Sequence, residues 1–365
     1  RRGYVFLTSD PAQARAFEEK AEEISALGAG PLRRHPGPVP YEPSPGEGFE
    51  NQPTGADLVL DPEIIQEHFP FITKEAIAML HPRRCGWLSA QQLGMYLLQE
   101  AKAHGISFVS GRVTGVEVQG GRVQAVHVGE ETIATDTFVV AAGPLLKETA
   151  QMLDVELPVF NELHGKISFE DHLEIVPRDA PLMIWNDPVK LIWTDEERAE
   201  LAADEKTRWL VESFPAGVHF RPEGSSQSNM ILALWTYDVD IMEPVWPTRF
   251  EPYYPEIVLR GLARMVPGFS VYAGRLRNVY VDGGYYCKTR ENRPLICPLP
   301  VDGSYVIGAL SGYGIMASQA AGELLAAHVT GGALPEYAPA FHLSRYEDAR
   351  YQAMLAEWDS SSGQL

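Results

Sequence analysis

Residues 279–329 place the tightest limit on what this chain can fold into. Their pattern predicts a strand ending in Gly283-Gly284, a proline-rich loop, a short apolar strand over 305–310, a glycine turn, and a helix from about Ile315. The first N–H groups of a helix lack intrahelical acceptors and carry the positive end of the helix dipole. The turn therefore predicts a site for a flat or negatively charged ligand.

The glycine turn also matches a nucleotide-binding fingerprint. Residues 312–317, GYGIMA, fit G-x-G-x-x-[GA] and lie between a predicted strand and a predicted helix. A complete dinucleotide-binding unit would continue with a second apolar strand ending in an acidic residue about twenty residues later. The chain continues instead with GGALPEY at 331–337. A different ligand role for the turn is therefore favoured over a complete βαβ unit.

Two motifs together indicate a family. Gly284-x4-Thr289-x-Glu291-x2-Pro294, followed by Ser311-Gly312-Tyr313-Gly314 and an alanine-rich helix, resembles the C-terminal signature of the D-amino-acid oxidase and sarcosine oxidase family of FAD-dependent enzymes. Two residues depart from it, because Glu291 replaces an Asp and Cys297 stands where Gly is usual. The resemblance implies an FAD cofactor with the helix start against the flavin ring. It implies that these residues bind the cofactor: Gly284, Gly312, Tyr313, Gly314 and Ile315.

The middle of the chain extends the resemblance. We predict a helix capped by Ser89 and ending near Gly105, strands over 106–109 and 113–118, a return strand over 122–128, and a buried strand over 136–142 that ends at Gly143. The resemblance implies that Val113 meets the adenine end of FAD and that Ala142 and Gly143 lie under the cofactor. The A-A-G-P sequence at 141–144 fits an ordinary strand-to-helix turn equally well.

After Pro158 the pattern changes to short alternating segments rich in aromatic and β-branched residues. They predict an antiparallel sheet with strands over 166–169, 182–185, 191–194, 219–221 and 230–235, and a helix over 254–265. Near the N-terminus, a helix over 12–27 follows the cap Ser9 or Asp10 and ends at Gly28. The resemblance implies that the sheet is the substrate domain and that residues 3–7 form an early strand of it.

The predicted fold class is α/β (α+β), with an incomplete FAD-binding Rossmann-like domain and an antiparallel-sheet substrate domain. Residues 1–84 are assigned to the first part of the substrate domain, with a long loop over 30–62 that is either an active-site cover or a surface excursion. Residues 85–157 are assigned to the middle of the FAD-binding domain, 158–271 to the antiparallel sheet, and 272–365 to the C-terminal part of the FAD-binding domain.

No N-terminal fingerprint for the FAD pyrophosphate is found at the two glycine pairs that could carry it. Neither Gly28-Ala29-Gly30 nor Gly46-Glu47-Gly48 follows a predicted strand and opens a helix. If the resemblance holds, at least one βαβ unit of about 30 residues precedes Arg1. The buried strand over 138–142 is then expected to lack a neighbour and to expose an apolar face.

Composition narrows the possible ligands. The formal net charge of −19 opposes binding to nucleic acid or anionic lipid, and no run of eighteen apolar residues predicts a membrane span. The expected partner is a small amine or amino acid. The three cysteines, Cys85, Cys287 and Cys297, have no metal-binding spacing, so no metal is predicted, and they fit a reducing, cytoplasmic compartment or simply buried thiols.

Tyr285 and Tyr286 are the predicted catalytic residues. In amino-acid oxidases of the family that the chain resembles, an Arg that binds the substrate carboxylate stands close to the position of Tyr286, and this chain has no Arg there. We therefore expect the substrate amine to be held by aromatic faces instead. Additional aromatic surface is expected from Trp185, Trp193, Trp235 and Tyr237. The alternative is that both tyrosines only pack a strand edge.

Other side chains of this segment have competing interpretations. Cys287 is either a flavin attachment point, as in some relatives, or a buried free thiol, which is favoured. Arg290 and Arg293 are expected to pair with local acids such as Glu291.

The predicted function is oxidation of the C–N bond of an amine or amino acid by hydride transfer to FAD. This chemistry requires little acid–base machinery, which agrees with the absence of a recognisable catalytic triad in the sequence. The alternative is a cofactor-free remnant that acts as an interaction or regulatory protein.

Overall fold

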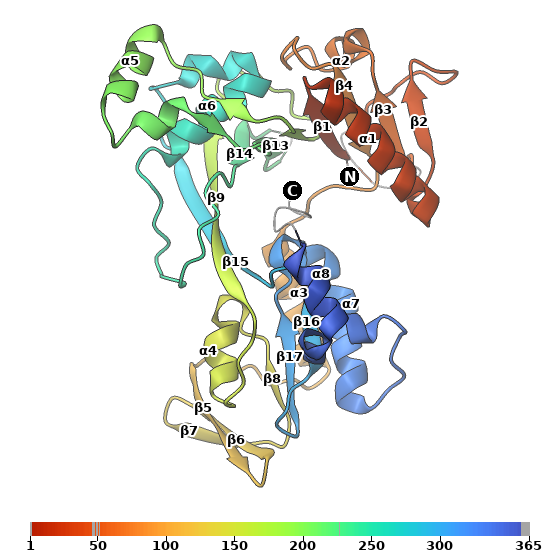
Figure 1. Ribbon diagram of the computed structural model, residues 1–365, viewed down its shortest axis with the longest axis vertical. Coiled ribbons are helices and arrows are strands. Elements are labelled where there is room, and N and C mark those ends of the chain that lie inside the picture. The colour runs from red at the N-terminus through yellow and green to blue at the C-terminus, as the bar shows by residue number, and fades with distance from the viewer. Residues whose placement is uncertain (1, 46–47, 49, 51, 226, 359–365) are drawn as a thin grey trace. The chain divides into compact units, whose positions relative to one another are not determined.

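The chain forms two compact units, each built from separate stretches of sequence (Figure 1). The computed structural model describes residues 2–45, 48, 50, 52–225 and 227–358. Unit 1 contains residues 1–88, 164–238 and 249–283, and unit 2 contains residues 89–163, 239–248 and 284–365. Of the two glycine pairs considered above, Gly46 and Glu47 lie outside the described residues, and Gly28 ends a helix rather than opening one.

A large mixed sheet organises unit 1, and two of its strands continue into residues 160–163 and 284–288, which belong to unit 2. Its nine described strands have the order β15-β9-β14-β13-β10-β1-β4-β3-β2. β1 pairs with β10 in parallel and β2 with β3 in parallel, whereas the pairs β1–β4, β3–β4, β10–β13, β13–β14 and β14–β9 are antiparallel. The strands are β1 (Tyr4–Thr8), β2 (Leu32–His35), β3 (Ala56–Val59), β4 (Ala78–Pro82), β9 (Phe160–Glu170), β10 (Leu182–Trp185), β13 (His219–Glu223), β14 (Met230–Leu234) and β15 (Tyr280–Lys288).

Helix α6 (Tyr254–Met265) packs into the core of this unit. Nine of its twelve residues are buried, and its apolar side chains join the core residues of the sheet. The indole rings of Trp185 and Trp235 are each only 1% exposed within that core. The remaining α-helices and strands described in this unit are α1 (Pro11–Ile24), α2 (Pro62–His68), α5 (Asp195–Ala203) and the short pair β11 (Val189–Lys190) and β12 (Ser213–Phe214).

The described part of unit 2 holds two small three-stranded sheets. One has the order β16-β17-β8, with β17 antiparallel to β16 and parallel to β8, so β8 is an edge strand. The other is the meander β5-β6-β7. The elements are α3 (Ala90–Ala103), β5 (Val113–Gln119), β6 (Arg122–Val128), β7 (Glu131–Ala134), β8 (Phe138–Val140), α4 (Leu146–Gln151), β16 (Leu295–Pro298), β17 (Ser304–Gly308), α7 (Gly314–Thr330) and α8 (Ala349–Ala356).

The predicted fold class is confirmed, and so are most predicted elements. Asp10 accepts a hydrogen bond from the N–H of Ala12 at the start of α1, and Ser89 accepts one from Gln92 at the start of α3. Residues 3–7 do contribute a strand, β1, to the large sheet. The sheet is mixed rather than purely antiparallel, because β1 and β2 each pair with a parallel neighbour.

Four local predictions were wrong. The segment 30–62 is not one long loop, because β2 and β3 lie within it, pair with each other and belong to the large sheet. Residues 106–109 form no strand, and Ile106 and Phe108 are 59% and 64% exposed. Residues 191–194 also form no strand, since the nearby ladder is at β11. β15 does not end at Gly283-Gly284 but runs through both glycines to Lys288. In each case the prediction rested on a local β-branched or glycine pattern, whereas strand bounds depend on a partner strand.

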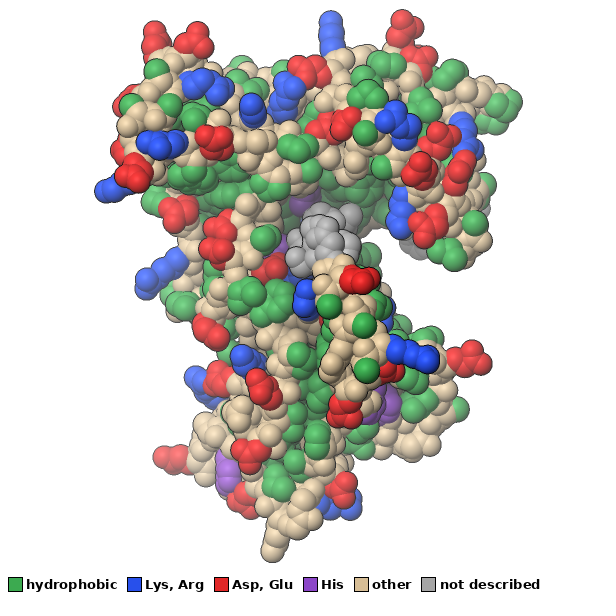
Figure 2. Space-filling view, in the orientation of Figure 1, with side chains coloured by type: hydrophobic (Ala, Val, Ile, Leu, Met, Phe, Trp, Pro, Cys, Tyr) green, Lys and Arg blue, Asp and Glu red, His purple; other side chains and the backbone are tan. Residues whose placement is uncertain are grey.

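The acidic side chains on the surface agree with the negative net charge of the chain. Figure 2 shows acidic side chains spread over the visible face rather than gathered in one patch. In the described part of the chain, no helix has the length and hydropathy needed to cross a membrane.

Candidate functional site

The turn that opens α7 lies in unit 2 and combines strained backbone with free N–H groups. Ala309 and Ser311 have φ values of 54° and 50°, which non-glycine residues rarely adopt. A single 3₁₀ turn, Ser311–Tyr313, then leads into the 17-residue helix, and no side chain among the described residues caps the start of that helix. The N–H groups of its first turn, from Gly314 onward, are therefore available to a polar ligand at the positive end of the dipole.

Gly312 and Tyr286 lie against each other in this turn. A Cβ atom on Gly312 would stand 2.8 Å from Cε2 of the Tyr286 ring, closer than real Cβ atoms approach a neighbour. Tyr286 comes from β15, so the strand and the turn meet at this point. Burial raises the pKa of the Tyr286 hydroxyl, which keeps it neutral at ordinary pH.

Because of that contact, Gly312→Ala is expected to destabilise the protein by about 1–3 kcal/mol, the usual cost of overpacking. In a Tyr286→Ala background the added methyl group has room, so most of the cost should disappear. A double-mutant cycle by urea unfolding measures the coupling. Equal costs in both backgrounds would show that the ring and the turn do not constrain each other.

Gly314 and Gly284 differ from Gly312, because both face open space. Within the described part of the chain, the nearest atom to a Cβ on Gly314 would be Cβ of Leu310 at 3.9 Å, and nothing lies within 4 Å of a Cβ on Gly284. Gly314 has ordinary helical backbone angles, with φ of −49° and ψ of −47°. Neither its conformation nor its packing within the protein therefore requires glycine.

Tyr285 holds the segment 239–248 in unit 2. Its hydroxyl accepts a hydrogen bond from the N–H of Val245 at 2.9 Å and donates one to the carbonyl of Val245 at 3.0 Å. The ring also packs edge-on against Trp246, with centroids 5.6 Å apart, and Trp246 is 58% exposed. The two rings form an open aromatic corner, which the sequence did not predict because Trp246 lies 39 residues before Tyr285.

A buried ion pair lies at Lys288, the last residue of β15. Nζ of Lys288 is 2.9 Å from a carboxylate oxygen of Glu162 on β9, and both side chains are less than 8% exposed. Lys288 and Tyr286 are two residues apart and so lie on the same side of the strand. That alternation could have placed Lys288 near the site, but no local pattern points to Glu162, 126 residues away.

The turn after β8 contains the predicted residues Ala142 and Gly143. Gly143 has a φ of 55°, and a Cβ there would meet no atom within 4 Å. The carbonyl of Pro144 accepts a hydrogen bond from Nδ2 of Asn161 at 3.0 Å, while Oδ1 of Asn161 is buried without a partner among the described residues. Val113 begins β5, in the other sheet of unit 2.

Cys287 points into the core of unit 2. It is 7% exposed and clusters with core residues that include Leu295 and Val306, and burial raises the pKa of its thiol to about 11. A thiol is nucleophilic only as thiolate, so this environment favours the buried-thiol interpretation over flavin attachment.

Alkylation tests that interpretation. Iodoacetamide treatment of the native protein at pH 7.5 is expected to leave Cys287 and the buried Cys297 unmodified, whereas half-buried Cys85 reacts faster. Peptide mass spectrometry before and after unfolding in urea measures the difference. Rapid native labelling of Cys287 would contradict its burial.

Glu291, at the position of the family's Asp, pairs differently from the prediction. One of its oxygens accepts hydrogen bonds from Arg345 at 2.8 Å, Tyr346 at 2.8 Å and Tyr351 at 2.9 Å. Pairing with Arg290 or Arg293 was therefore wrong, and Arg293 lies beside the Tyr351 ring instead. Burial acts to raise the pKa of Glu291, but its hydrogen bonds and the nearby Arg345 charge lower it overall.

These residues have features that fit a flavin. The uncapped α7 start supplies N–H donors for a negatively polarised ring edge. Gly143, Gly284 and Gly314 leave open space where a flat group could approach the backbone. Among the described residues, no group of three or more His, Cys, Asp or Glu side chains could hold a metal ion.

Comparison with known proteins also supports a flavin-binding protein. The family model described as FAD dependent oxidoreductase matches residues 1–328. The fold resembles L-proline dehydrogenase from P. horikoshii, with a TM-score of 0.68 and 16% identity over 95% of this chain and 76% of that one.

Two further solved structures are similar. Glycine oxidase from Geobacillus kaustophilus has a TM-score of 0.67 and 15% identity, over 94% of this chain and 75% of that one. Iminodiacetate oxidase from Chelativorans sp. BNC1 has a TM-score of 0.65 and 14% identity, over 94% and 76%. At such identities the structural likeness concerns the fold alone.

Proposed function

Because this chain belongs to the family of FAD-dependent oxidoreductases, we propose that it oxidises the C–N bond of a small amine or amino acid. In this reaction the carbon next to nitrogen gives up a hydride and the nitrogen gives up a proton, so the C–N single bond becomes an imine. FAD, when bound, would accept the hydride with its two electrons. The similar solved proteins are named for proline, glycine and iminodiacetate, each of which has a C–N bond of this kind.

The observation that carries the proposal is the uncapped start of α7 beside Tyr286. Its N–H groups and positive dipole end, from Gly314 and Ile315 onward, suit a ring edge that becomes more negative on reduction. Gly312 lets the Tyr286 ring approach the turn. We assign the backbone of residues 312–315 to the flavin edge, and Gly284, Ala142, Gly143 and Val113 to other parts of the cofactor.

For the substrate, we propose that aromatic faces hold the amine. Tyr285 and Trp246 form the open corner, and Tyr286 stays uncharged because burial raises its pKa. An ammonium group over an aromatic face gains about 0.5–2 kcal/mol. The sequence-based prediction that Trp185 and Trp235 supply this surface was wrong, because both rings are buried in the core of unit 1.

A visible absorbance spectrum tests the cofactor assignment. After reconstitution with FAD and gel filtration, the protein is expected to keep flavin absorbance bands, which fade when a substrate amine is added without oxygen. A protein that retained no flavin would favour the alternative, a cofactor-free interaction or regulatory protein.

Turnover comparisons test the substrate assignment separately. We expect kcat/KM for N-methylated amines to exceed that for free D-amino acids, and Trp246→Ala to raise KM more than it lowers kcat. Strong preference for simple D-amino acids, with no effect of Trp246→Ala, would overturn the aromatic-corner assignment and leave the flavin assignment intact.

A further inference from the structure

Two adjoining cavities lie in unit 1 beside α5, α6 and β11. Their volumes are about 290 Å³ and about 520 Å³, and both are lined by Ile192 and Trp193. Cavities that hold small organic molecules typically measure about 300–1,000 Å³. None of their lining residues has a role in the function proposed above.

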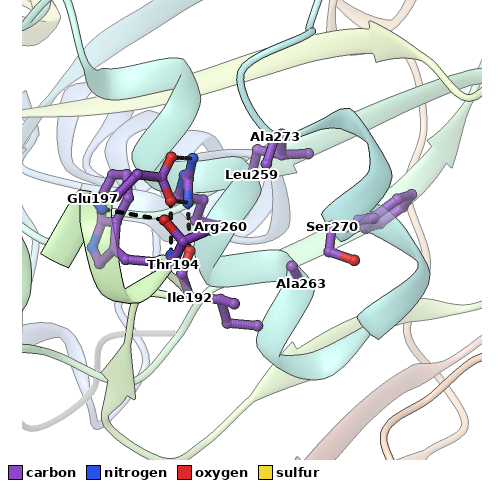
Figure 3. A pocket seen from close by; sticks show the side chains of 10 residues that line it. Ile192, Thr194, Glu197, Leu259, Arg260, Ala263, Ser270 and Ala273 are labelled. Atoms are coloured by element: carbon purple, nitrogen blue, oxygen red, sulfur yellow. Dashed lines mark hydrogen bonds and ion pairs between the residues drawn. The ribbon is translucent and has the colours of Figure 1, made fainter.

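The smaller cavity offers apolar surface. In Figure 3, Leu259, Ala263 and Ala273 lie on one side, and Arg260, Glu197 and Thr194 gather on the other. The Arg260 guanidinium stacks over the Trp193 ring at 3.9 Å from its centroid.

The charges of this cavity are already engaged. Arg260 donates to Glu197 at 2.7 Å, to Glu256 at 2.6 Å and to the carbonyl of Ile192 at 2.6 Å. Glu197 also accepts from the N–H of Thr194 at 2.8 Å. The cavity therefore attracts an apolar group rather than a charged one.

The larger cavity is cationic. Among the described residues, its lining includes Lys190, Arg198 and Arg264 and no acidic residue. Arg264 pairs with Glu75, but neither Lys190 nor Arg198 has an ion-pair partner in the part of the chain that the structure describes. Two such cations in one cavity stand out in a chain of net charge −19, where acids outnumber bases 49 to 30.

We propose that the two cavities together bind a small organic anion with an apolar ring or branched chain. Its anionic group lies between Lys190 and Arg198, and its apolar body reaches the smaller cavity across Ile192, which is 42% exposed. An inorganic anion would leave the apolar cavity unused, and a neutral molecule would leave the cations unpaired. Both parts of the ligand are therefore needed for affinity.

Calorimetric titration with three probes tests this site. We expect 1-naphthoate to bind at least about tenfold more tightly than either 1-naphthalenemethanol, its neutral counterpart, or sulfate, which lacks the ring. If sulfate or the alcohol bound as tightly as 1-naphthoate, the proposed combination of anion and apolar body would be wrong.

Charge-reversal variants locate the binding. Lys190→Glu and Arg198→Glu should each weaken 1-naphthoate binding by about fivefold or more, as expected for loss of one cation and gain of one like charge near the surface. The matched control is Arg15→Glu, which makes the same charge change at an exposed position of α1 outside both cavities. Equal affinity in all three variants would place the naphthoate elsewhere and overturn the proposal.

A variant of the apolar side completes the test. Ser270, an exposed residue of the smaller cavity, can be changed to Phe to occupy that space with little effect on folding. Ser270→Phe is expected to reduce 1-naphthoate affinity about fivefold or more and to leave the weak sulfate affinity unchanged. Undiminished naphthoate binding would exclude the smaller cavity, and with it the proposed ligand class.

Discussion

Arg345→Met is expected to lower the free energy of unfolding by about 3–5 kcal/mol, because it leaves the buried Glu291 carboxylate without its cation. The side chains of Arg345 and Glu291 are 4% and 0% exposed. Tyr346 and Tyr351 would still donate to Glu291, but hydroxyl groups cannot neutralise its charge. Urea unfolding followed by circular dichroism measures the loss.

Arg350→Met is the matched control, since Arg350 is exposed on α8 and its loss should change stability by less than about 0.5 kcal/mol.

The pH dependence of the free energy of unfolding gives a second measurement. The pKa of Glu291 in the folded state lies below its ordinary value of 4.5, so the stabilisation is present above pH 4.5 and is lost as the pH falls through the folded-state pKa. Glu291→Gln should remove that part of the acid sensitivity. An unchanged acid profile would argue that Glu291 is not charged in the fold.

Gly314→Val is expected to weaken flavin binding about tenfold or more while leaving the protein folded. The side chain would point into open space at the α7 start, where nothing in the protein resists it but a flat ligand would. A ligand held away from the helix start forfeits its interaction with the dipole and the N–H groups, which is worth up to about 2 kcal/mol. Flavin retained after gel filtration measures affinity, and dye equilibration of the bound flavin measures its potential, which should fall.

Gly322→Val is the control for this variant. Gly322 also lies in α7, a Cβ there would meet nothing within 4 Å, and the propensity cost is similar. It is expected to bind flavin normally. If Gly314→Val kept normal flavin affinity and potential, the turn would be a structural helix entry, and the assignment of residues 312–315 would fail.

Features specified by neighbouring residues were predictable from the sequence. Asp10 and Ser89 cap α1 and α3 as expected, and α6 has the predicted bounds because Pro267 and Gly268 follow just after its C-cap residue, Val266. The strand–turn–helix at α7 was also predictable, since its glycines and its apolar strand lie within a few residues of one another.

Pairings between distant residues were not predictable. Glu291 pairs with Arg345, which lies 54 residues later in the sequence, and Lys288 pairs with Glu162, which lies 126 residues earlier. In both cases the local sequence offered nearer charges, Arg290 and Arg293 among them, but the fold decides which groups are buried together. Likewise, the aromatic pattern did not distinguish the core residue Trp235 from the exposed Trp246.

Side chains of β15 point alternately to its two faces, and this alternation limits where the chain tolerates insertions and deletions. Cys287 faces the core of unit 2, whereas Tyr286 meets Gly312 and Lys288 meets Glu162. Adding or removing one residue between Gly284 and Thr289 would exchange these faces, burying a lysine among core side chains and presenting a thiol beside the turn. Length changes should therefore be absent from this strand in functional homologues.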